Sequence, residues 1–326
     1  MRFNSVLFAL IVTSLAGCVE VWENSQATTI VRGDEAVLWS ADLVARREAA
    51  TLRRLRLKIE SDDDIATPGY DNVPSAQDHW MSCRLAQDDG TFVAGPVAID
   101  ASNYVEFNNV TFDLFVLEAD KVKVICQSST LAVESGTPDR YAGVLENKND
   151  IEFEDTNGDV VQRINHVTGL GTYVDVLDNG DLEIAFDGPP ASDMAAGDQG
   201  VLIAEYTAYG AYEHIAMDQL YFHLDGHIDI ADSVEVIYTQ LDGNMISQDV
   251  YHDANGDFNL SNVDALADAD GELIQVYADI SVNALPGQFL NVTLNADRTR
   301  AYGLTSGARP NLIPASGIRS NNRTVF

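Results

Sequence analysis

The stretch that decides the fold is VLIAEYTAYGAYEHIAMDQLYFHL, residues 201–224, in which apolar and polar side chains alternate on both sides of a short polar turn. Alternation with a period of two is typical of strands with one buried face, so the stretch predicts two antiparallel strands. Residues 36–59, AVLWSADLVARREAATLRRLRLKI, follow the same apolar rhythm without a gap, at an offset of 165 from 36 to 201. The identical residues are Glu48 and Glu213, and Leu55 and Leu220. The chain is therefore predicted to contain one β-domain built twice.

The elements after the two stretches come in the same order. The corresponding pairs are 80–85 and 234–241, 89–90 and 242–243, 107–108 and 258–259, and 122–126 and 274–278. The offset falls from 165 at the two stretches to about 152 along these pairs, with 126 and 278 as the last. Unrelated sandwiches also share alternation, but a preserved order favours duplication. By this alignment Thr239 and Ala278 are the counterparts of Cys83 and Cys126.

Length and composition agree with two β-domains. A chain of 326 residues with 46% hydrophobic residues can bury two cores. Short strands separated by Gly, Asn and Asp turns predict an all-β fold of two tandem antiparallel sandwiches. Asn179-Gly180 predicts a type I′ hairpin between strands at 171–177 and 181–186. A further strand is expected at 159–164, and 46–51 is read as the turn, with a helical turn as the alternative. The predicted boundaries are a leader at 1–18, a tether at 19–29, domain 1 at 30–135, a linker at 136–150, domain 2 at 151–305 and a basic tail at 306–326.

The first eighteen residues predict export. Arg2 precedes a short apolar run at 6–15, which ends in Leu15-Ala16-Gly17-Cys18. A basic start, a short apolar run and small residues before a cleavage point are typical of a secretory signal. The tetrad at 15–18 resembles the bacterial lipobox, and this resemblance implies a lipid-modified Cys18 that attaches the chain to a membrane. The alternative is an ordinary signal peptide with an incidental Cys. The predicted location is the cell envelope, facing the exterior or the periplasm.

The cysteine count fits an exported chain. The sequence contains three cysteines, Cys18, Cys83 and Cys126. If Cys18 carries lipid, an even pair remains in a compartment where disulfides persist. We therefore expect a Cys83–Cys126 disulfide across the core of domain 1, with metal binding by the two residues as the weaker alternative.

The charge is strongly negative. The formal net charge is -32, and no Lys or Arg occurs between His166 and Asp297. Such a surface repels phosphate, so nucleic acid is excluded as a partner. Solubility or a salty habitat accounts for the acidity; divalent cations or a basic partner are the alternatives.

The cations gather in one strand. Arg54, Arg56 and Lys58 alternate with apolar residues, so they are expected on one solvent-exposed face. One interpretation is that the stripe offsets nearby carboxylates of its own domain. The other is that it docks on an acidic face, which belongs either to the second domain or to another molecule. Opposite patches speed and orient association, so the docking alternative predicts salt-sensitive self-association.

Three Asp-rich turns could bind calcium. Alternating Asp and Asn side chains supply the oxygen ligands that Ca²⁺ prefers. Each turn lacks the twelfth-position Glu of a complete calcium loop, and the sequence favours a plain hairpin turn, with calcium binding as the alternative. The candidate ligands are Asp155, Asn157 and Asp159; Asp253, Asn255 and Asp257; and Asp268, Asp270 and Glu272.

No catalytic motif stands out. The sequence lacks a GxSxG elbow, an HExxH pair, a P-loop and a Gly-rich dinucleotide turn. His223 and His227 are four residues apart, a spacing that does not form a metal site on a strand. The chain is therefore predicted not to be an enzyme, and no cofactor is required.

The second copy resembles a known family. Its sequence combines GVLIAEYTA, DQLYFHL, a DG turn, DGELIQVYADI and GQFLNV. This pattern is similar to the tandem Ig-like β-sandwich repeats of large bacterial surface and S-layer-type proteins, over about residues 170 to 305 and more loosely in the first copy. The resemblance implies Ig-like sandwiches that act as spacers, lattice units or adhesive modules. This chain departs from the family by being short and by carrying a lipobox, which favours an anchored accessory protein with a structural or adhesive role. A calcium- or carbohydrate-binding surface module is the alternative.

Overall fold

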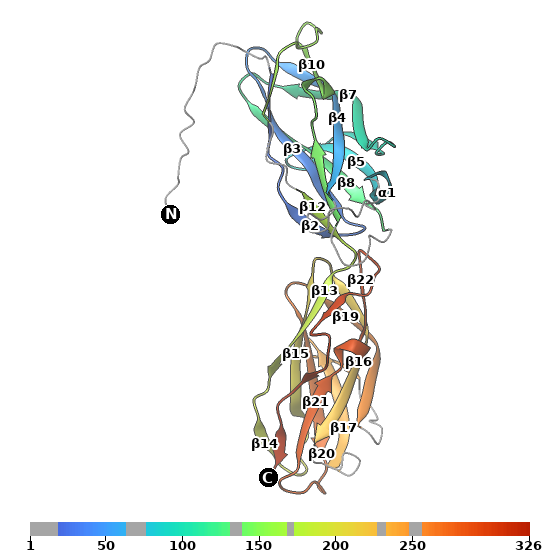
Figure 1. The fold of residues 1–326 in the computed structure, drawn as a ribbon. Helices are drawn as coiled ribbons and strands as arrows, with labels where there is room; N and C mark the ends of the chain where they lie inside the picture. The colour runs from blue at the N-terminus through green and yellow to red at the C-terminus, as the bar shows by residue number, and fades with distance from the viewer. Residues whose placement is uncertain (1–18, 63–75, 131–138, 168–172, 227–232, 248–255) are drawn as a thin grey trace. The chain divides into compact units, whose positions relative to one another are not determined.

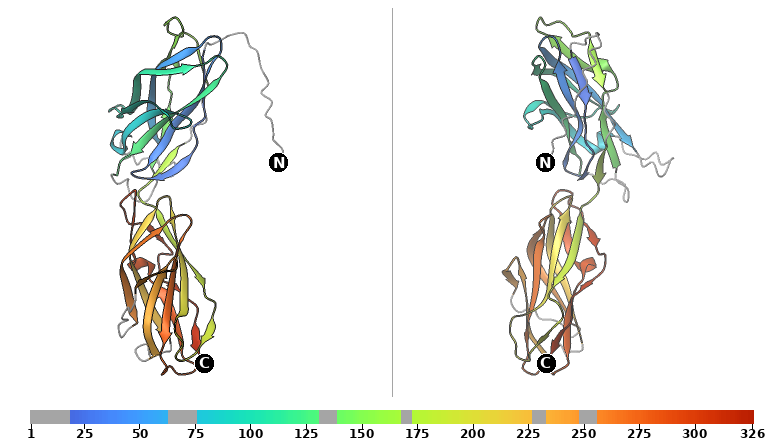
Figure 2. Two further views of the ribbon diagram at one scale, coloured as in Figure 1. Left: turned by 180° about the vertical axis from the view of Figure 1, so that it is seen from behind. Right: turned by 90° about the vertical axis from the view of Figure 1, so that its left-hand side faces the viewer.

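The computed structural model of the chain describes residues 19–62, 76–130, 139–167, 173–226, 233–247 and 256–326. The described chain is almost entirely β and forms two compact units, each built as a pair of facing sheets (Figures 1 and 2). Unit 1 consists of residues 1–28, 35–128 and 140–174, and unit 2 of residues 29–34, 129–139 and 175–326. The prediction of an all-β fold of two mainly antiparallel sandwiches is confirmed.

Unit 1 is built on two sheets. The first has the order β11-β1-β3-β8-β5-β6; its strands are β1 (Val19–Glu23), β3 (Glu35–Ala45), β5 (Trp80–Gln87), β6 (Phe92–Val97), β8 (Ala119–Ser128) and β11 (Ile164–Val167). The second has the order β10-β4-β9-β12-β2, with β7 beside β4; its strands are β4 (Ala50–Asp62), β7 (Tyr104–Leu114), β9 (Asp139–Val144) and β10 (Ile151–Asp155), together with β2 (Thr28–Val31) and β12 (Val174–Leu177). Most residues of β2 and β12 fall in the segments 29–34 and 175–326 that are grouped with unit 2. The short helix α1 (Ala76–His79) and the 3₁₀ turn η1 (Lys148–Asp150) complete its elements.

Unit 2 repeats this design. One sheet has the order β18-β17-β20-β15-β13-β23, with β13 (Asp181–Gly188), β15 (Val201–Ala211), β17 (Val234–Leu241), β18 (Asn244–Ser247), β20 (Glu272–Ile280) and β23 (Asn311–Ile313). The other has the order β14-β25-β21-β16-β19, with β22 and β24 beside β16 and β21. Its strands are β14 (Ser192–Met194), β16 (Ile215–Gly226), β19 (Asp257–Ala267), β21 (Phe289–Leu294), β22 (Arg300–Gly303), β24 (Ile318–Arg319) and β25 (Arg323–Val325), and η2 spans Ala296–Arg298.

The duplication extends to the irregularities of the strands. The register of β3 shifts between Val37 and Trp39, and that of β15 shifts between Leu202 and Ala204, 165 residues later. The same offset relates the shifts in β4, after Leu52, and in β16, after Met217. Bulges bend and twist a strand locally, so their shared positions give both sandwiches the same curvature.

The repeat is longer than its sequence signal. Parallel pairing joins β1 to β11 in unit 1 and β13 to β23 in unit 2. The run β9-η1-β10-β11 has its counterpart in β21-η2-β22-β23. These short strands carry too few residues for a recognisable alternation, which is why the predicted boundaries miss them.

Several predicted boundaries are therefore wrong. The expected tether contains β1 and β2, the expected linker contains β9 and η1, and the expected basic tail contains β23, β24 and β25. Strands β10 and β11 complete the first copy rather than opening the second, and 156–163 is a turn region instead of a strand. Asn179-Gly180 joins β12 to β13, which lie in different sheets, and neither residue has the positive φ that a type I′ turn needs. The 46–49 segment is a turn, as expected.

The two cores fill equivalent space with different residues. Unit 1 has Trp39 and Ala41 where unit 2 has Ala204 and Tyr206, and all four are fully buried. Trp39 lies against Gly143, where a Cβ would come within 2.8 Å of the Trp39 Cβ. The large and small residues have thus exchanged places between copies, which preserves close packing.

Candidate functional site

The predicted anchor precedes the first strand directly. Cys18 and the leader lie outside the described residues. Strand β1 begins at Val19, which pairs with Ala45 of β3 on one side and with Ile164 of β11 on the other. Val19 is fully buried. None of the described helices is long or apolar enough to span a bilayer.

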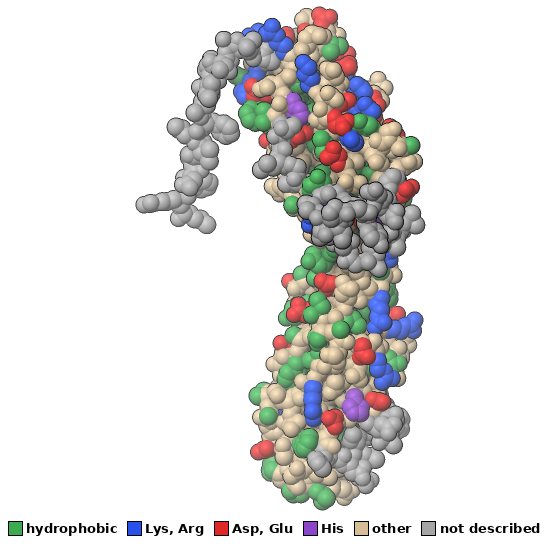
Figure 3. Space-filling model, viewed as in Figure 1, with side chains coloured by type: hydrophobic (Ala, Val, Ile, Leu, Met, Phe, Trp, Pro, Cys, Tyr) green, Lys and Arg blue, Asp and Glu red, His purple; other side chains and the backbone are tan. Residues whose placement is uncertain are grey.

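The cationic stripe lies on the solvent face of β4, as its alternation predicts. Arg54 Nε binds Glu106 on β7 at 2.7 Å, and Arg56 lies 3.6 Å from Asp150 of η1. The Arg56 guanidinium also lies 3.7 Å from the centre of the Tyr104 ring. Red and blue side chains accordingly lie next to one another on the visible face of unit 1 (Figure 3).

The last cation of the stripe is also paired within unit 1. Lys58 Nζ lies 3.1 Å from Glu146, which accepts a further hydrogen bond from the Tyr104 hydroxyl. The hydrogen bond from Tyr104, together with Lys58, lowers the pKa of the Glu146 carboxyl, and the Arg54 hydrogen bond lowers the pKa of Glu106. Each of the three cations of the stripe therefore offsets a local carboxylate, which is the internal alternative of the two that the sequence left open.

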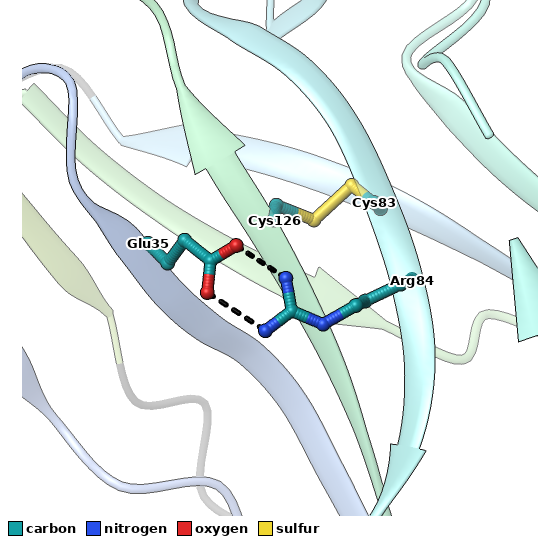
Figure 4. The surroundings of a disulfide bond; sticks show 4 residues. All are labelled: Glu35, Cys83, Arg84 and Cys126. Carbon is teal, nitrogen blue, oxygen red and sulfur yellow. Dashed lines mark hydrogen bonds and ion pairs between the residues drawn. A yellow bond between two sulfur atoms is a disulfide. The ribbon is translucent and has the colours of Figure 1, made fainter. Parts of the chain in front are cut away.

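The two remaining cysteines form a disulfide. Cys83 on β5 and Cys126 on β8 are directly opposite one another in the same sheet, with Cα atoms 4.0 Å apart (Figure 4). The bond therefore links two neighbouring strands of one sheet. The prediction that it crosses the core between facing sheets is wrong. The equivalent pair in unit 2 is Ile237 and Ala278, so the predicted counterpart Thr239 is displaced by one period of the strand. This slip arises because the alternating pattern of a strand looks the same after two residues.

An ion pair lies beside the disulfide. Both guanidinium Nη atoms of Arg84 bind the two carboxylate oxygens of Glu35, one of them at 2.7 Å (Figure 4). The Arg84 hydrogen bond holds the pKa of Glu35 below its usual value. This bidentate contact joins β3 to β5 across β8, the strand that lies between them and carries Cys126, on the solvent-exposed face of the sheet.

The first acidic turn uses its carboxylate to hold the backbone. The Asp155 Oδ1 atom accepts hydrogen bonds from the amides of Asn157, at 2.8 Å, and Asp159, at 3.0 Å. Gly158 has a φ of 85°, as a tight turn requires. The two amide bonds lower the pKa of the Asp155 carboxyl.

The other acidic turns show similar engagement where they are described. Asp268 Oδ1 accepts the amides of Asp270, at 2.9 Å, and Gly271, at 3.2 Å. Burial raises the pKa of the Glu272 carboxyl, and the nearby carboxylates of Asp242 and Asp268 raise it further. Asp253 and Asn255 lie outside the described residues, and Asp257 lies 2.9 Å from His223 Nδ1. Within the described ranges, no group of three His, Cys, Asp or Glu residues is placed to hold a metal ion.

Glu213 organises a set of loops that the sequence did not reveal. Its carboxylate accepts hydrogen bonds from the amides of Gly180, Thr305 and Ser306, and from the Ser306 hydroxyl, at 2.7 to 3.0 Å. A Cβ on Gly303 would lie 2.2 Å from the same carboxylate. In the sequence, Glu213 stands out only by its identity with Glu48 in the first copy. Its hydrogen-bond partners could not be predicted, because they lie 33 to 93 residues away in sequence.

Tyr206 is a second structural polar residue. Its hydroxyl, on one sheet of unit 2, donates to the carbonyl oxygen of Val292, on the facing sheet, at 2.8 Å. Burial raises the pKa of this hydroxyl. The residue therefore ties the two sheets together as a neutral donor.

Neither family models nor curated proteins match the sequence. Among solved structures, the chain is similar to CBD12 from CALX1.2, with a TM-score of 0.37 and 9% identity over 94% of this chain and 100% of that one. It is also similar to the C-terminal domain of the Streptococcus agalactiae AgI/II polypeptide BspA, with a TM-score of 0.24 and 9% identity over 94% and 99% of the chains. The BSP domain of a biofilm associated protein gives a TM-score of 0.24 and 8% identity over 93% and 59%. At these values the likenesses assign neither a ligand nor a partner to this chain.

Proposed function

We propose that this chain is an exported protein, attached by a lipid on Cys18 and acting at the cell surface as a structural, spacer or adhesive module. The observation that carries the proposal is the position of the lipobox tetrad, which ends one residue before β1 begins at Val19. A lipid-modified Cys18 would become the first residue of the mature chain, and the sandwich would follow it directly.

The side chains support a structural role. The charged groups that could have formed a reactive site are engaged in holding the fold: Glu213 binds loop amides, and Asp155 and Asp268 cap turns. Two of the described candidate calcium ligands, Asp155 and Asp268, are themselves occupied by turn amides, which supports the turn role over the calcium alternative. The stripe of Arg54, Arg56 and Lys58 has partners within its own unit, and a docking role for it stays a prediction.

Fractionation of a bacterial host tests the proposal. The chain with its own leader is expressed beside a Cys18→Ser variant, which keeps the apolar run but removes the thiol that carries the lipid. The proposal predicts that the parent pellets with membranes and is labelled by a membrane-impermeant reagent after the envelope is opened, while the variant is released as a soluble protein. Equal release of both chains would contradict lipid attachment.

A further inference from the structure

An apolar surface marks one end of unit 1. The turn between β7 and β8 exposes three consecutive apolar residues, Phe115 at 60%, Val116 at 42% and Leu117 at 67%. Val160, in the turn after β10, is 47% exposed. We call these four residues the apolar tip. Contiguous exposed apolar side chains commonly mark a contact surface.

The turn holds its apolar residues in an unusual conformation. Leu117 has a φ of 64°, in the left-handed region that Gly or Asn ordinarily occupies. Its amide donates to the Ala45 carbonyl oxygen at 2.8 Å, which fixes the turn against the end of β3. The equivalent turn of unit 2, residues 268–271, reads DADG and contains Gly271 at a φ of 88°. The duplicated fold therefore needs no apolar turn here, and the tip is particular to the copy that follows Cys18.

The tip lies at the end of the sandwich where the chain enters. Val19 pairs with Ala45, and Ala45 bridges Val116. Neighbouring strands are about 4.8 Å apart, so the first residue of β1 lies about 10 Å from the tip. The β10 strand ends at the same edge, because Asp155 pairs with Ala50, and this places the Val160 turn there as well.

From these positions we infer that the apolar tip inserts into the surface of the lipid bilayer that holds the acyl chains of Cys18. This inference rests on the proposed lipid attachment. Because β1 starts at the next residue, no spacer separates the sandwich from the bilayer, and this end of unit 1 must lie at the head groups. The acyl chains hold the chain at one point, and burial of the apolar Phe115 and Leu117 side chains in the interface adds apolar area to the attachment.

The charges around the tip indicate apolar rather than electrostatic attraction. Arg46 and Arg47 are exposed in the adjacent turn, with Arg46 bound to Glu20 at 2.6 Å. Glu118 is exposed and Asp120 is half-buried on the other side. Cations and anions are thus mixed, so zwitterionic lipid suffices and anionic lipid adds no attraction.

Depth-dependent fluorescence quenching tests the inference on the full chain. Phe115→Cys and, separately, Leu117→Cys are labelled with an environment-sensitive dye, after purification from membranes and reconstitution into phosphatidylcholine vesicles. The control is Leu285→Cys, an equally exposed apolar residue at 63% in a loop of unit 2. Two tip positions are used because Leu117 has a left-handed backbone and Phe115 does not, so agreement between the two dyes does not depend on that conformation. The intact mass of each chain reports separately whether Cys18 is acylated.

The inference predicts that quenchers in the head-group and upper acyl region remove most of the dye emission at residues 115 and 117 and leave that at 285 unchanged. An acylated chain whose tip dyes behave like the 285 dye would overturn the inference while leaving the anchor intact. A membrane-recovered chain without acyl groups would overturn the proposed function, and the inference with it.

Discussion

At the scale of single residues, the Glu213 carboxylate holds two loops of unit 2 together through hydrogen bonds from their backbone amides. Three amides and one hydroxyl converge on it, from a segment before β13 and a loop after β22. Convergent amides form a nest for an anion, and here the anion belongs to the chain itself. The sequence marked this position by its identity with Glu48, but could not give its partners, because they come from distant loops.

Replacing Glu213 with Gln should destabilise unit 2. The amide nitrogen of Gln cannot accept the hydrogen bonds that one carboxylate oxygen receives, so we expect a loss of about 2–4 kcal/mol in the free energy of unfolding. Glu235→Gln, on an exposed position of β17, is the matched control and should change the free energy by less than about 0.5 kcal/mol. Chemical denaturation of both variants measures the difference; equal stabilities would contradict the assigned role.

At the scale of elements, β7 and β19, the corresponding edge strands of the two units, each contain an Asn with a left-handed backbone. Asn109 has a φ of 55°, and Asn262, at the equivalent position, has a φ of 58°. Strand β7 continues through Asn109 as one strand, Tyr104–Leu114, with this irregularity inside it. Asn tolerates the left-handed region, and such bulges also discourage edge-to-edge pairing.

This position gives a two-variant test. Asn109→Ala should cost about 1–2 kcal/mol, because a β-carbon without a local hydrogen bond disfavours the left-handed backbone. Asn109→Gly should keep the stability close to that of the parent, since glycine adopts this conformation freely. Urea unfolding of the two variants distinguishes them, and a Gly variant as unstable as the Ala variant would point to a lost side-chain contact instead.

The disulfide can be tested with residues borrowed from the second copy. Cys83→Ile with Cys126→Ala reproduces the Ile237–Ala278 pair, so the packing is retained while the cross-link is removed. For the 43-residue separation, loop-closure entropy predicts a loss of about 4 kcal/mol. Denaturation of the variant, beside the parent with and without reductant, measures it. A variant as stable as the oxidised parent would show that packing alone holds β5 to β8.

At the scale of the whole molecule, the net charge of -32 opposes compaction, while paired carboxylates favour it. Ion pairs or hydrogen bonds lower the pKa of seven described carboxyl groups; these belong to Glu20, Glu35, Asp88, Asp89, Glu106, Glu146 and Asp155. These seven groups stabilise the folded state at pH values above their unfolded pKa of about 4. This stabilisation is lost as the pH falls through their lower pKa values in the folded state. Asp120 and Glu272 have raised pKa values, so they favour the folded state more as the pH falls toward 4.

The melting temperature should therefore pass through a maximum. Between pH 7 and about pH 5 we expect the melting temperature to rise, because repulsion among the negative charges decreases and because the destabilising ionised forms of Asp120 and Glu272 become less populated. Below about pH 4 it should fall, as the paired carboxylates become protonated. Calorimetry at constant ionic strength checks this, and a melting temperature that kept rising to pH 3 would contradict the importance of the pairs.

Long alternating strands made the fold predictable from sequence, and short strands limited the prediction. The β3–β4 and β15–β16 pairs each give enough alternation to reveal the repeat. Strands such as β23, with three residues, take their pairing from neighbours and leave no pattern. The stripe on β4 could be placed on its face, but its partners Glu106 and Glu146 could not, because they depend on which strands are adjacent. The apolar turn at 115–117 was missed because it continued an apolar strand pattern.

The proposed function requires a lipid-modified Cys18 that leads directly into the first sandwich. The most direct measurement is the intact mass of the chain extracted from the membranes of a bacterial host that processes its leader. We expect a mass equal to residues 18–326 with the Cys83–Cys126 disulfide and an added diacylglyceryl group, with or without a further acyl chain. A chain cleaved at another residue, or one that begins at Cys18 without lipid, would contradict it.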